Sequence, residues 1–300
     1  MKAIQYTEYG GPEVLRLVET DTPTPAPGEI LIAVKAAGVN GIDGKTRAGY
    51  LREFAPVTFP SGTGLDAAGT VVAVGDGVAG VAEGDEVFGS GRDTLAEYAV
   101  LTGWAVKPPS VSFAEASGYP LPAETAVRML RLTEVKKGDT VLISGASGGV
   151  GSAAIQIAVS RGARVIGTAS QANHDYLRSL GAIPIRYGPG LVARAQTAAG
   201  SPVDAALDVA GSGVLPELIE LVGTPARVVT CADFSGRGLG VHTTLAAEDY
   251  TGACELVAGL AARGAFTIPV ARSFALADAG AAQESNARGH IAGRTVVVLG

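Results

Sequence analysis

Cysteines, clustered basic residues and long apolar runs are all scarce in this 300-residue chain. Its two cysteines, Cys231 and Cys254, are too few for a disulfide framework or a four-thiolate zinc site. We expect them to be small buried side chains in a reducing compartment. No apolar run reaches the length of a membrane span, and the N-terminal MKAIQYTEYGGPEVL turns polar after four residues, unlike a signal peptide. The sequence therefore predicts a cytoplasmic protein with no membrane partner.

An excess of positive charge is also lacking. The formal net charge is -6, the isoelectric point is near 5.2, and lysines and arginines are scattered along the chain. A basic groove for nucleic acid or an anionic membrane is therefore not expected. What is abundant is hydrophobic residues, at 47%, together with 42 glycines and 16 prolines. This is the composition of a globular protein with many turns.

The pattern of the chain changes twice. Short β-rich runs separated by Pro and Gly turns fill the first part, and from about Phe113 helical stretches alternate with apolar strands such as TVLIS and ARVIGTAS. Strands spaced by helices predict an α/β fold with a doubly wound parallel sheet. The end of the chain is too short for a domain of its own. We predict a β-rich domain over 1–115, a nucleotide-binding domain over 116–255, and a segment 256–300 that returns to the first domain.

The stretch LISGASGGVGSAAIQIA, residues 142–158, runs from an apolar strand through glycines into a helix. A dinucleotide site needs these three parts, because the turn lets the backbone approach a pyrophosphate and the helix N-terminus presents free N–H groups. Ala146, Gly148 and Gly151 fill the key positions of the G-x-G-x-x-G template. The alternative is a structural turn before a helix. The predicted cofactor-binding residues of the turn are Ala146, Ser147, Gly148, Gly149 and Val150.

The strand after this helix ends at Ala169 and Ser170 without a carboxylate. NAD-preferring sites carry an acid there, about 20 residues after the glycines, that binds the ribose hydroxyls. With no acid to repel a 2′-phosphate and with Ser170 able to donate a hydrogen bond, the sequence favours NADP. His174 would add a donor or a positive charge, or else is a solvated residue at a helix start.

Eight motifs occur in order along nearly the whole chain: GPEVL, AAGVNGID, GLDAAGTVVAVG, GDEVFG, TLAEYAV, GASGGVGSAAIQIA, LRSLGA and GRTVVVL. In these motifs the sequence resembles the zinc-independent, quinone oxidoreductase-like branch of the medium-chain dehydrogenase/reductases. The resemblance implies an N-terminal GroES-like catalytic domain, a Rossmann domain and a cleft between them that holds NADPH. It also implies a homodimer, commonly joined through the edges of the Rossmann sheets.

Zinc-dependent members of the superfamily place ligands where this chain has Asn40, Leu65 and a residue near Leu121. None of these side chains holds zinc, so the resemblance implies no metal and disfavours alcohol dehydrogenation, which needs a Lewis acid. The chemistry left is hydride transfer to an acceptor that is already electrophilic. A quinone can take its proton from solvent. An α,β-unsaturated carbonyl leaves an enolate, which needs a hydrogen-bond donor and a general acid.

The resemblance also assigns residues near the reaction. Asn40 matches an asparagine beside the nicotinamide and the substrate, and would otherwise cap the following turn. Tyr50 falls where related enoyl reductases carry a tyrosine proton donor, and would otherwise be a packed or substrate-lining aromatic. Asp43 is either a carboxylate that orients the loop or a proton-transfer group. Thr125, at the start of the helix TAVRML, either contacts the nicotinamide end or is an ordinary helix-start hydroxyl.

Later strand ends supply the remaining candidates. Tyr187 matches a tyrosine that lines the 2′-phosphate pocket of NADPH-specific quinone reductases, or is a core aromatic. Gly211, Ala232 and Phe234 follow later strands and would face the cofactor. The family's GADxVIDY reads GAIPIRYGPG here, and the prolines of that stretch disturb the third strand. His242 and His290 are expected to have surface or structural roles.

These observations predict an NADPH-dependent, zinc-free oxidoreductase of the quinone reductase type, with Asn40 and Tyr50 facing a small-molecule quinone or enone. Two alternatives remain open. One is an enoyl or alkenal reductase that uses Tyr50 as its acid. The other is an NADPH-binding sensor or scaffold with little turnover, which the scarcity of obvious catalytic groups permits.

Overall fold

The computed structural model describes residues 1–289 and 291–299, so His290 lies outside the described residues. The chain divides into two compact units, of which one is Met1–Leu121 with Asp249–Gly300 and the other is Pro122–Glu248. The predicted boundaries at residues 115 and 255 stay a prediction. Within the described ranges, no helix has both the length and the apolar character needed to cross a membrane.

The first unit is built on two β-sheets. A six-stranded sheet has the order β14-β15-β3-β5-β6-β7, with a further pairing of β3 with β7, and a three-stranded sheet has the order β2-β1-β4. The strands are β1 Lys2–Tyr6, β2 Arg16–Glu19, β3 Ile30–Val39, β4 Ser61–Gly62, β5 Asp66–Val74, β6 Glu86–Arg92, β7 Tyr98–Val106, β14 Val270–Ala275 and β15 Arg294–Val298. The helices are α1 Gly41–Arg47, α2 Phe113–Ala116, α8 Tyr250–Ala262 and α9 Ala279–Ala287, with 3-10 turns η1 Pro12–Val14 and η5 Leu276–Asp278.

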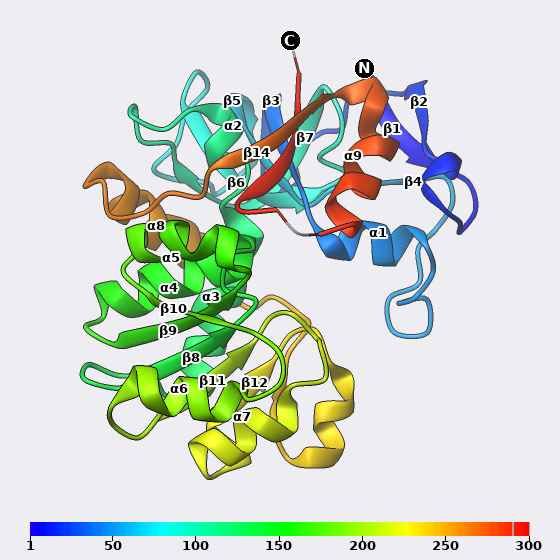
Figure 1. Ribbon diagram of the computed structural model, residues 1–300. Coiled ribbons are helices and arrows are strands. Elements are labelled where there is room, and N and C mark those ends of the chain that lie inside the picture. The colour runs from blue at the N-terminus through cyan, green and yellow to red at the C-terminus, as the bar shows by residue number, and fades with distance from the viewer. Residues whose placement is uncertain (290, 300) are drawn as a thin grey trace. The chain divides into compact units, whose positions relative to one another are not determined.

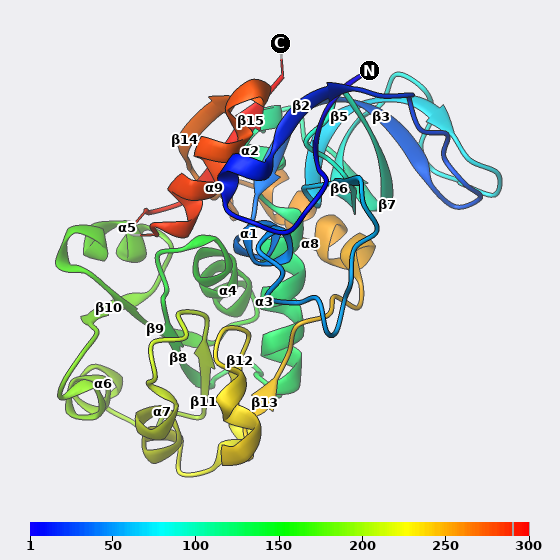
Figure 2. The ribbon, with the colours of Figure 1, turned by 90° about the vertical axis from the view of Figure 1, so that its right-hand side faces the viewer.

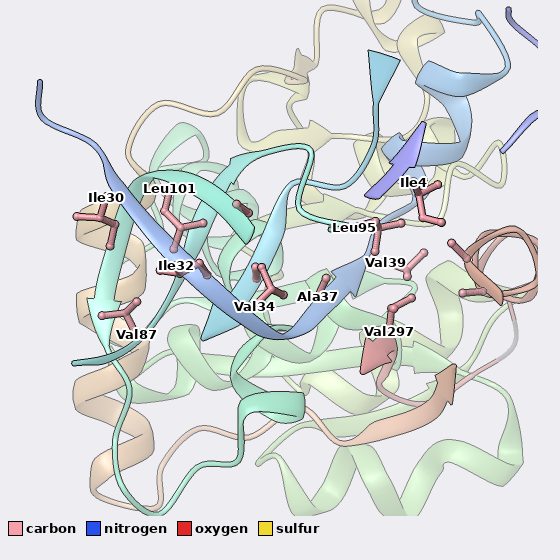
Figure 3. Close-up of a cluster of buried hydrophobic side chains, with 14 of the residues drawn as sticks. Ile4, Ile30, Ile32, Val34, Ala37, Val39, Val87, Leu95, Leu101 and Val297 are labelled. Atoms are coloured by element: carbon pink, nitrogen blue, oxygen red, sulfur yellow. The ribbon is translucent and has the colours of Figure 1, made fainter. Parts of the chain in front are cut away.

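Strand β3 forms the centre of this unit. Its apolar side chains, such as Ile30, Ile32 and Val39, are almost completely buried and pack with those of neighbouring strands (Figure 3). Register shifts along the β3–β5 pairing let the long strand bend as it passes between its partners. The last strand, β15, runs antiparallel to β3, with Val297 opposite Ala37. The two ends of the sequence thus share one core, and α9 lies beside β14 and β15 (Figure 2).

The second unit holds a six-stranded sheet of order β10-β9-β8-β11-β12-β13, in which every pairing is parallel. The strands are β8 Thr140–Ser144, β9 Arg164–Ala169, β10 Ile183–Arg186, β11 Ala205–Asp208, β12 Val228–Thr230 and β13 His242–Thr243. The helices are α3 Pro120–Leu132, α4 Gly149–Ser160, α5 His174–Ser179, α6 Leu191–Ala199 and α7 Leu215–Val222, with 3-10 turns η2 Gln171–Asn173, η3 Pro225–Arg227 and η4 Phe234–Leu239.

This sheet is doubly wound, as the sequence predicts. Helices α4 and α5 cover one face of the sheet, and α6 and α7 cover the other (Figure 1). The core of the second face joins Leu142 and Ile166 of the strands to Leu191 and Leu218 of the helices. The chain winds outward in both directions from β8, whose neighbours are β9 and β11. In such sheets a ligand binds beyond the carboxyl ends of the strands at this reversal point.

Two local expectations need correction. Thr125 does not begin a helix, because α3 starts at Pro120, where proline is tolerated in the first turn. Thr125 is instead a buried residue inside α3. Pro184 does not disrupt the third strand, because it lies within β10, which is an edge strand that needs no partner for its missing N–H on the open side.

Candidate functional site

The glycine turn lies where the sheet reverses. Gly145 follows β8 with a positive φ of 80°, a conformation that glycine adopts without strain. Its amide donates to Oγ1 of Thr168 at 3.1 Å, and the Ala146 amide donates to the carbonyl of the same threonine at 3.0 Å. Thr168 on β9 thus holds the turn beside the next strand.

Two glycines of the turn serve different purposes. A Cβ at Gly151 would lie 2.4 Å from the carbonyl oxygen of Gly145 and 2.6 Å from Cα of Ala146, so this glycine lets α4 pack directly on the turn. A Cβ at Gly148 would meet nothing nearer than 3.7 Å. Gly148 is the N-cap of α4, whose first N–H groups have no partner within the helix. Free N–H groups at a helix start are the kind that bind phosphate, so Gly148, Gly149 and Val150 stay predicted cofactor residues.

The end of β9 is tied to the same turn. Ser170 precedes the short helix η2, and Asn173 within that helix donates from Nδ2 to Oγ of Ser147 at 3.2 Å. His174 then opens α5 with only 7% of its surface exposed. Its Nε2 is buried and has no hydrogen-bond partner among the described residues. His174 is therefore not a solvated helix-start residue, because its ring is buried and its Nε2 keeps an unused donor or acceptor.

The sequence analysis missed a cation at this strand end. In the parallel pairing of β10 with β9, Arg186 lies opposite Ala169, so the next residues, Tyr187 and Ser170, follow neighbouring strand ends. Arg186 is exposed and forms no ion pair within residues 1–289 and 291–299. Tyr187 is 58% exposed, which rules out a core aromatic. Only the strand register reveals that Arg186 is close to Ser170.

Arg194 of α6 fixes the loop after Arg186. Its guanidinium donates to three carbonyl oxygens of the loop, those of Arg186 at 3.0 Å, Gly188 at 2.8 Å and Pro189 at 2.7 Å. Gly188 and Gly190 have positive φ angles of 92° and 79°. One side chain therefore sets the path of the loop that carries Tyr187.

The next two strand ends are joined by a buried hydrogen-bond chain. Oδ1 of Asp208, at the end of β11, accepts from the amides of Ala210 and Gly211, and Oδ2 accepts from Oγ1 of Thr230 at 2.9 Å. The Thr230 oxygen in turn accepts from the amide of Ala232 at 3.1 Å. The structure thus brings two predicted residues, Gly211 and Ala232, together. It also identifies Asp208 and Thr230 as the residues that position them.

Phe234 and Thr125 are not part of that chain. Phe234 is the first residue of η4 and is partly exposed, as a residue beside a ligand or solvent would be. Thr125 lies within α3, next to Glu124, whose buried carboxylate pairs with Arg128 at 2.9 Å. Among the described residues, no hydrogen bond or ion pair joins the side chain of Phe234 or Thr125 to the glycine turn, and the roles of both residues stay predictions.

In the first unit, Asn40 lies between two charged groups. It is the N-cap residue of α1 and is 2% exposed. Its Oδ1 accepts from the Arg294 guanidinium at 2.6 Å, and its Nδ2 donates to Oδ2 of Asp66 at 3.0 Å. The Asp66 carboxylate also accepts from the Leu121 amide, and Nη2 of Arg294 lies 3.8 Å from it. Both ends of the Asn40 carboxamide are therefore fixed in direction.

Two carboxyl groups of this cluster are fully buried. Burial, together with the neighbouring Asp66, raises the pKa of Asp43 to about 7, although the Asn40 backbone amide, which donates to Asp43 at 2.8 Å, and Arg294 oppose the rise. Burial also raises the pKa of Asp66 to about 6, while Arg294 opposes that rise. The pKa of Arg294 is lowered by burial. Asn40 and Asp43 were candidates from the sequence, whereas Asp66 and Arg294 are identified by the structure alone.

Tyr50 does not belong to this cluster. Its side chain is 77% exposed, just beyond α1, and its amide donates to the carbonyl of Lys45 at 3.0 Å. The loop that follows is held at its far end by Tyr9, whose hydroxyl accepts from the Val57 amide. Tyr50 is therefore exposed to solvent, whereas the Asn40 side chain is buried and is held in place by its hydrogen bonds to Asp66 and Arg294.

Two family models match the chain. The alcohol dehydrogenase GroES-like domain matches residues 26–103, and the zinc-binding dehydrogenase family matches residues 149–247. The matched region of the second family contains the glycine turn from Gly149 onward. No group of His, Cys, Asp and Glu side chains among the described residues is arranged as a metal site.

Individual proteins are similar over different lengths. The chloroplastic NADPH-dependent alkenal/one oxidoreductase of Arabidopsis thaliana is 39% identical over 198 residues, which are 61% of this chain and 51% of that protein. The solved quinone oxidoreductase of Coxiella burnetii is 33% identical with a TM-score of 0.85, and the match covers 100% of this chain and 99% of that one. The Escherichia coli quinone oxidoreductase complexed with NADPH is 28% identical with a TM-score of 0.86, with both chains covered completely.

The matches with curated relatives span between 50% and 59% of the length of those proteins. The structural matches, by contrast, extend over the whole chain and include the doubly wound sheet with its glycine turn. The predicted fold of a GroES-like unit and a Rossmann unit is therefore confirmed. The chain belongs to the quinone oxidoreductase-like branch of the medium-chain dehydrogenase/reductase superfamily.

Proposed function

We propose that this protein is an NADPH-dependent oxidoreductase that reduces a quinone or an α,β-unsaturated carbonyl compound. The observation that carries the proposal is the glycine turn at the start of α4, where a Cβ at Gly148 would meet nothing nearer than 3.7 Å, at the reversal point of a doubly wound sheet and beside a strand end without an acid. A relative named as NADPH-dependent and a related structure complexed with NADPH support the choice of cofactor.

The residues of the second unit fit the parts of a dinucleotide. The N–H groups at the start of α4 would bind the pyrophosphate, with Gly148 leaving room for it. Gly211 and Ala232, held by Asp208 and Thr230, would line the cofactor at the ends of β11 and β12. When bound, the nicotinamide ring supplies a hydride ion.

The end of β9 and β10 would recognise the adenosine 2′-phosphate. Ser170 offers a hydroxyl, Tyr187 an exposed phenol, and Arg186 a positive charge that no described acid neutralises. The unpartnered Nε2 of His174 points to a further polar contact in the same region. An arginine near this strand end accommodates a 2′-phosphate in NADP sites. Arg186, and not His174, would therefore supply the positive charge that binds the 2′-phosphate.

Asn40 would act on the acceptor by hydrogen bonding. One N–H of its carboxamide is used by Asp66, and the second N–H remains for an acceptor oxygen. A donor fixed in direction stabilises negative charge that develops on that oxygen, because it needs no reorganisation during the reaction. Arg294 and Asp66 would fix that direction. The protein's other contribution is to orient the reactants and exclude water.

Reduction of an alkenal with Tyr50 as the proton donor is the second candidate. It is favoured by the exposed phenol of Tyr50 and by the name of the Arabidopsis relative. The expected homodimer and cytoplasmic location are proposals that follow from family membership and from composition. Neither of them enters the choice between the two acceptors.

The function is tested by following NADPH oxidation with a naphthoquinone, a benzoquinone and an alkenal, for the wild type and for Tyr50→Phe. Quinone reduction at a rate that Tyr50→Phe leaves unchanged supports the first candidate. A variant that loses only alkenal reduction supports the second. The proposal is wrong if NADPH binds and no acceptor of either class is reduced, which would favour a sensor or scaffold.

A further inference from the structure

The side chains around Asn40 carry an unequal number of opposite charges. Asp43, Asp66 and Arg294 are all buried, so two carboxyl groups share one guanidinium. If every group were ionised, the cluster would carry a net charge of one negative unit away from water. Burying an uncompensated charge is costly, and such groups take up a proton instead. One of the two carboxyl groups therefore keeps a proton.

The hydrogen bonds indicate which one. Asp66 accepts from the Leu121 amide and from Nδ2 of Asn40, and it is the carboxylate that lies within ion-pair distance of Arg294. Asp43 accepts a hydrogen bond from the backbone N–H of Asn40 and has no ion pair among the described residues. An anion is stabilised by the donors and cations around it, and Asp66 has more of both. The proton therefore belongs to Asp43.

No other cation of the packed elements neutralises Asp43. Arg47 follows on the same helix, but its guanidinium donates to Oε1 of Gln283 on α9 and to the carbonyl of Gly10. The charged groups that act on Asp43 are Asp66, which disfavours its ionisation, and Arg294, which favours it. The higher pKa of Asp43 compared with that of Asp66 agrees with this assignment.

We propose that Asp43 holds its proton in the working protein and is a positioning residue that keeps the Asn40–Asp66–Arg294 cluster electrically neutral. This inference rests on the proposed function in one respect, the placement of Asn40 beside the reacting atoms. Ionisation of Asp43 adds a negative charge next to Asn40 and competes with Asp66 for Arg294. It therefore opposes the negative charge that develops on an acceptor oxygen.

The direct test is infrared difference spectroscopy of the full-length protein without cofactor, below and above a pH of about 7, the pKa of Asp43. The wild type should show the carbonyl stretch of a protonated carboxylic acid, which shifts in D₂O and disappears as the pH rises. Asp43→Asn should lack the component of the band that titrates near pH 7 and keep only the contribution of Asp66, which titrates near pH 6. The exposed Asp76 provides the control, since Asp76→Asn should retain the band. A wild type without a band that titrates near pH 7, or the same component surviving in Asp43→Asn, overturns the proposal.

A second variant keeps the test decisive if Asp43→Asn fails to fold. Asp66→Asn leaves Asp43 as the sole carboxylate beside Arg294, so the midpoint of the band should move to lower pH. An unchanged midpoint overturns the proposal.

Turnover gives a separate readout. NADPH oxidation by the wild type should decline as Asp43 ionises, whereas Asp43→Asn should keep its rate over that pH range. A decline of the same size in Asp43→Asn contradicts the positioning role. If no acceptor is reduced at all, the proposed function fails while the infrared result still decides the protonation of Asp43.

Discussion

A methyl group added at two glycines of the same turn should separate cofactor binding from folding. Gly148 has φ -76° and ψ 176°, which any residue adopts, and a Cβ there meets nothing closer than 3.7 Å. The unfavourable exchange of glycine for alanine at an N-cap is offset by the smaller entropy of the unfolded chain. Gly148→Ala should therefore change the free energy of unfolding by less than about 0.5 kcal/mol.

The same methyl group lies in front of the amides that would bind the pyrophosphate. Losing one hydrogen bond to a charged group costs roughly 1.5–3 kcal/mol, so the dissociation constant for NADPH should rise about 10- to 100-fold. Isothermal titration calorimetry of Gly148→Ala against the wild type measures this change.

Gly151→Ala is the matched variant that should lower stability. Its Cβ would lie 2.4 Å from the Gly145 carbonyl oxygen and 2.6 Å from the Ala146 Cα, and both are backbone atoms. Such overpacking costs about 1–3 kcal/mol, and a loss of about 2 kcal/mol lowers the Tm by roughly 4–8 °C in a domain of this size. Thermal unfolding without cofactor measures it. Wild-type NADPH affinity in Gly148→Ala, or wild-type stability in Gly151→Ala, would refute the assignment of the two glycines.

Three further results are expected. Arg186→Met should weaken NADPH binding about tenfold and leave NADH binding unchanged, because it removes the cation proposed to face the 2′-phosphate. Calorimetry with both cofactors measures these affinities. The control is Arg131→Met, which breaks the exposed ion pair of Arg131 with Glu248 and should change neither affinity. Tyr50→Phe should slow alkenal reduction and not quinone reduction, and equal slowing of both would show that Tyr50 acts by packing. The folded-state pKa of Asp43, about 7, lies above its unfolded value, so the stability that its protonation contributes is complete below about pH 4 and is lost as the pH rises towards 7. This loss amounts to about 4 kcal/mol, and urea unfolding at several pH values should show a loss in Asp43→Asn that is smaller than that of the wild type by this amount, because only the contribution of Asp66 remains.

The second unit could be predicted well because its signals are local. The run TVLIS became β8, the glycines became the turn, and the helix after them became α4, since each element is specified by neighbouring residues. The start of α3 was misplaced because Pro120 and Pro122 look like breaks in the sequence, although proline is accepted in a first helical turn. The same reasoning applies to Pro184, whose tolerance depends on β10 being an edge strand.

The candidate site was harder to predict because its contacts cross the chain. Asn40 meets Asp66 across 26 positions and Arg294 across 254 positions, and these pairs exist because β5 and β15 both lie beside β3. Arg186 comes close to Ser170 through the parallel register of β10 with β9. A sequence motif does not contain this information. The candidate residues come together only through the pairing of strands that are distant in the sequence.

The central claim is that the second unit binds NADPH through the glycine turn and the acid-free end of β9. The most direct measurement is equilibrium titration of the purified wild-type protein with NADPH and NADH, followed by cofactor fluorescence or by the emission of Trp104, the single tryptophan. Tight binding of NADPH and much weaker binding of NADH is the predicted result. Equal affinities would contradict the roles of Ser170, Arg186 and Tyr187, and no binding of either cofactor would contradict the account as a whole.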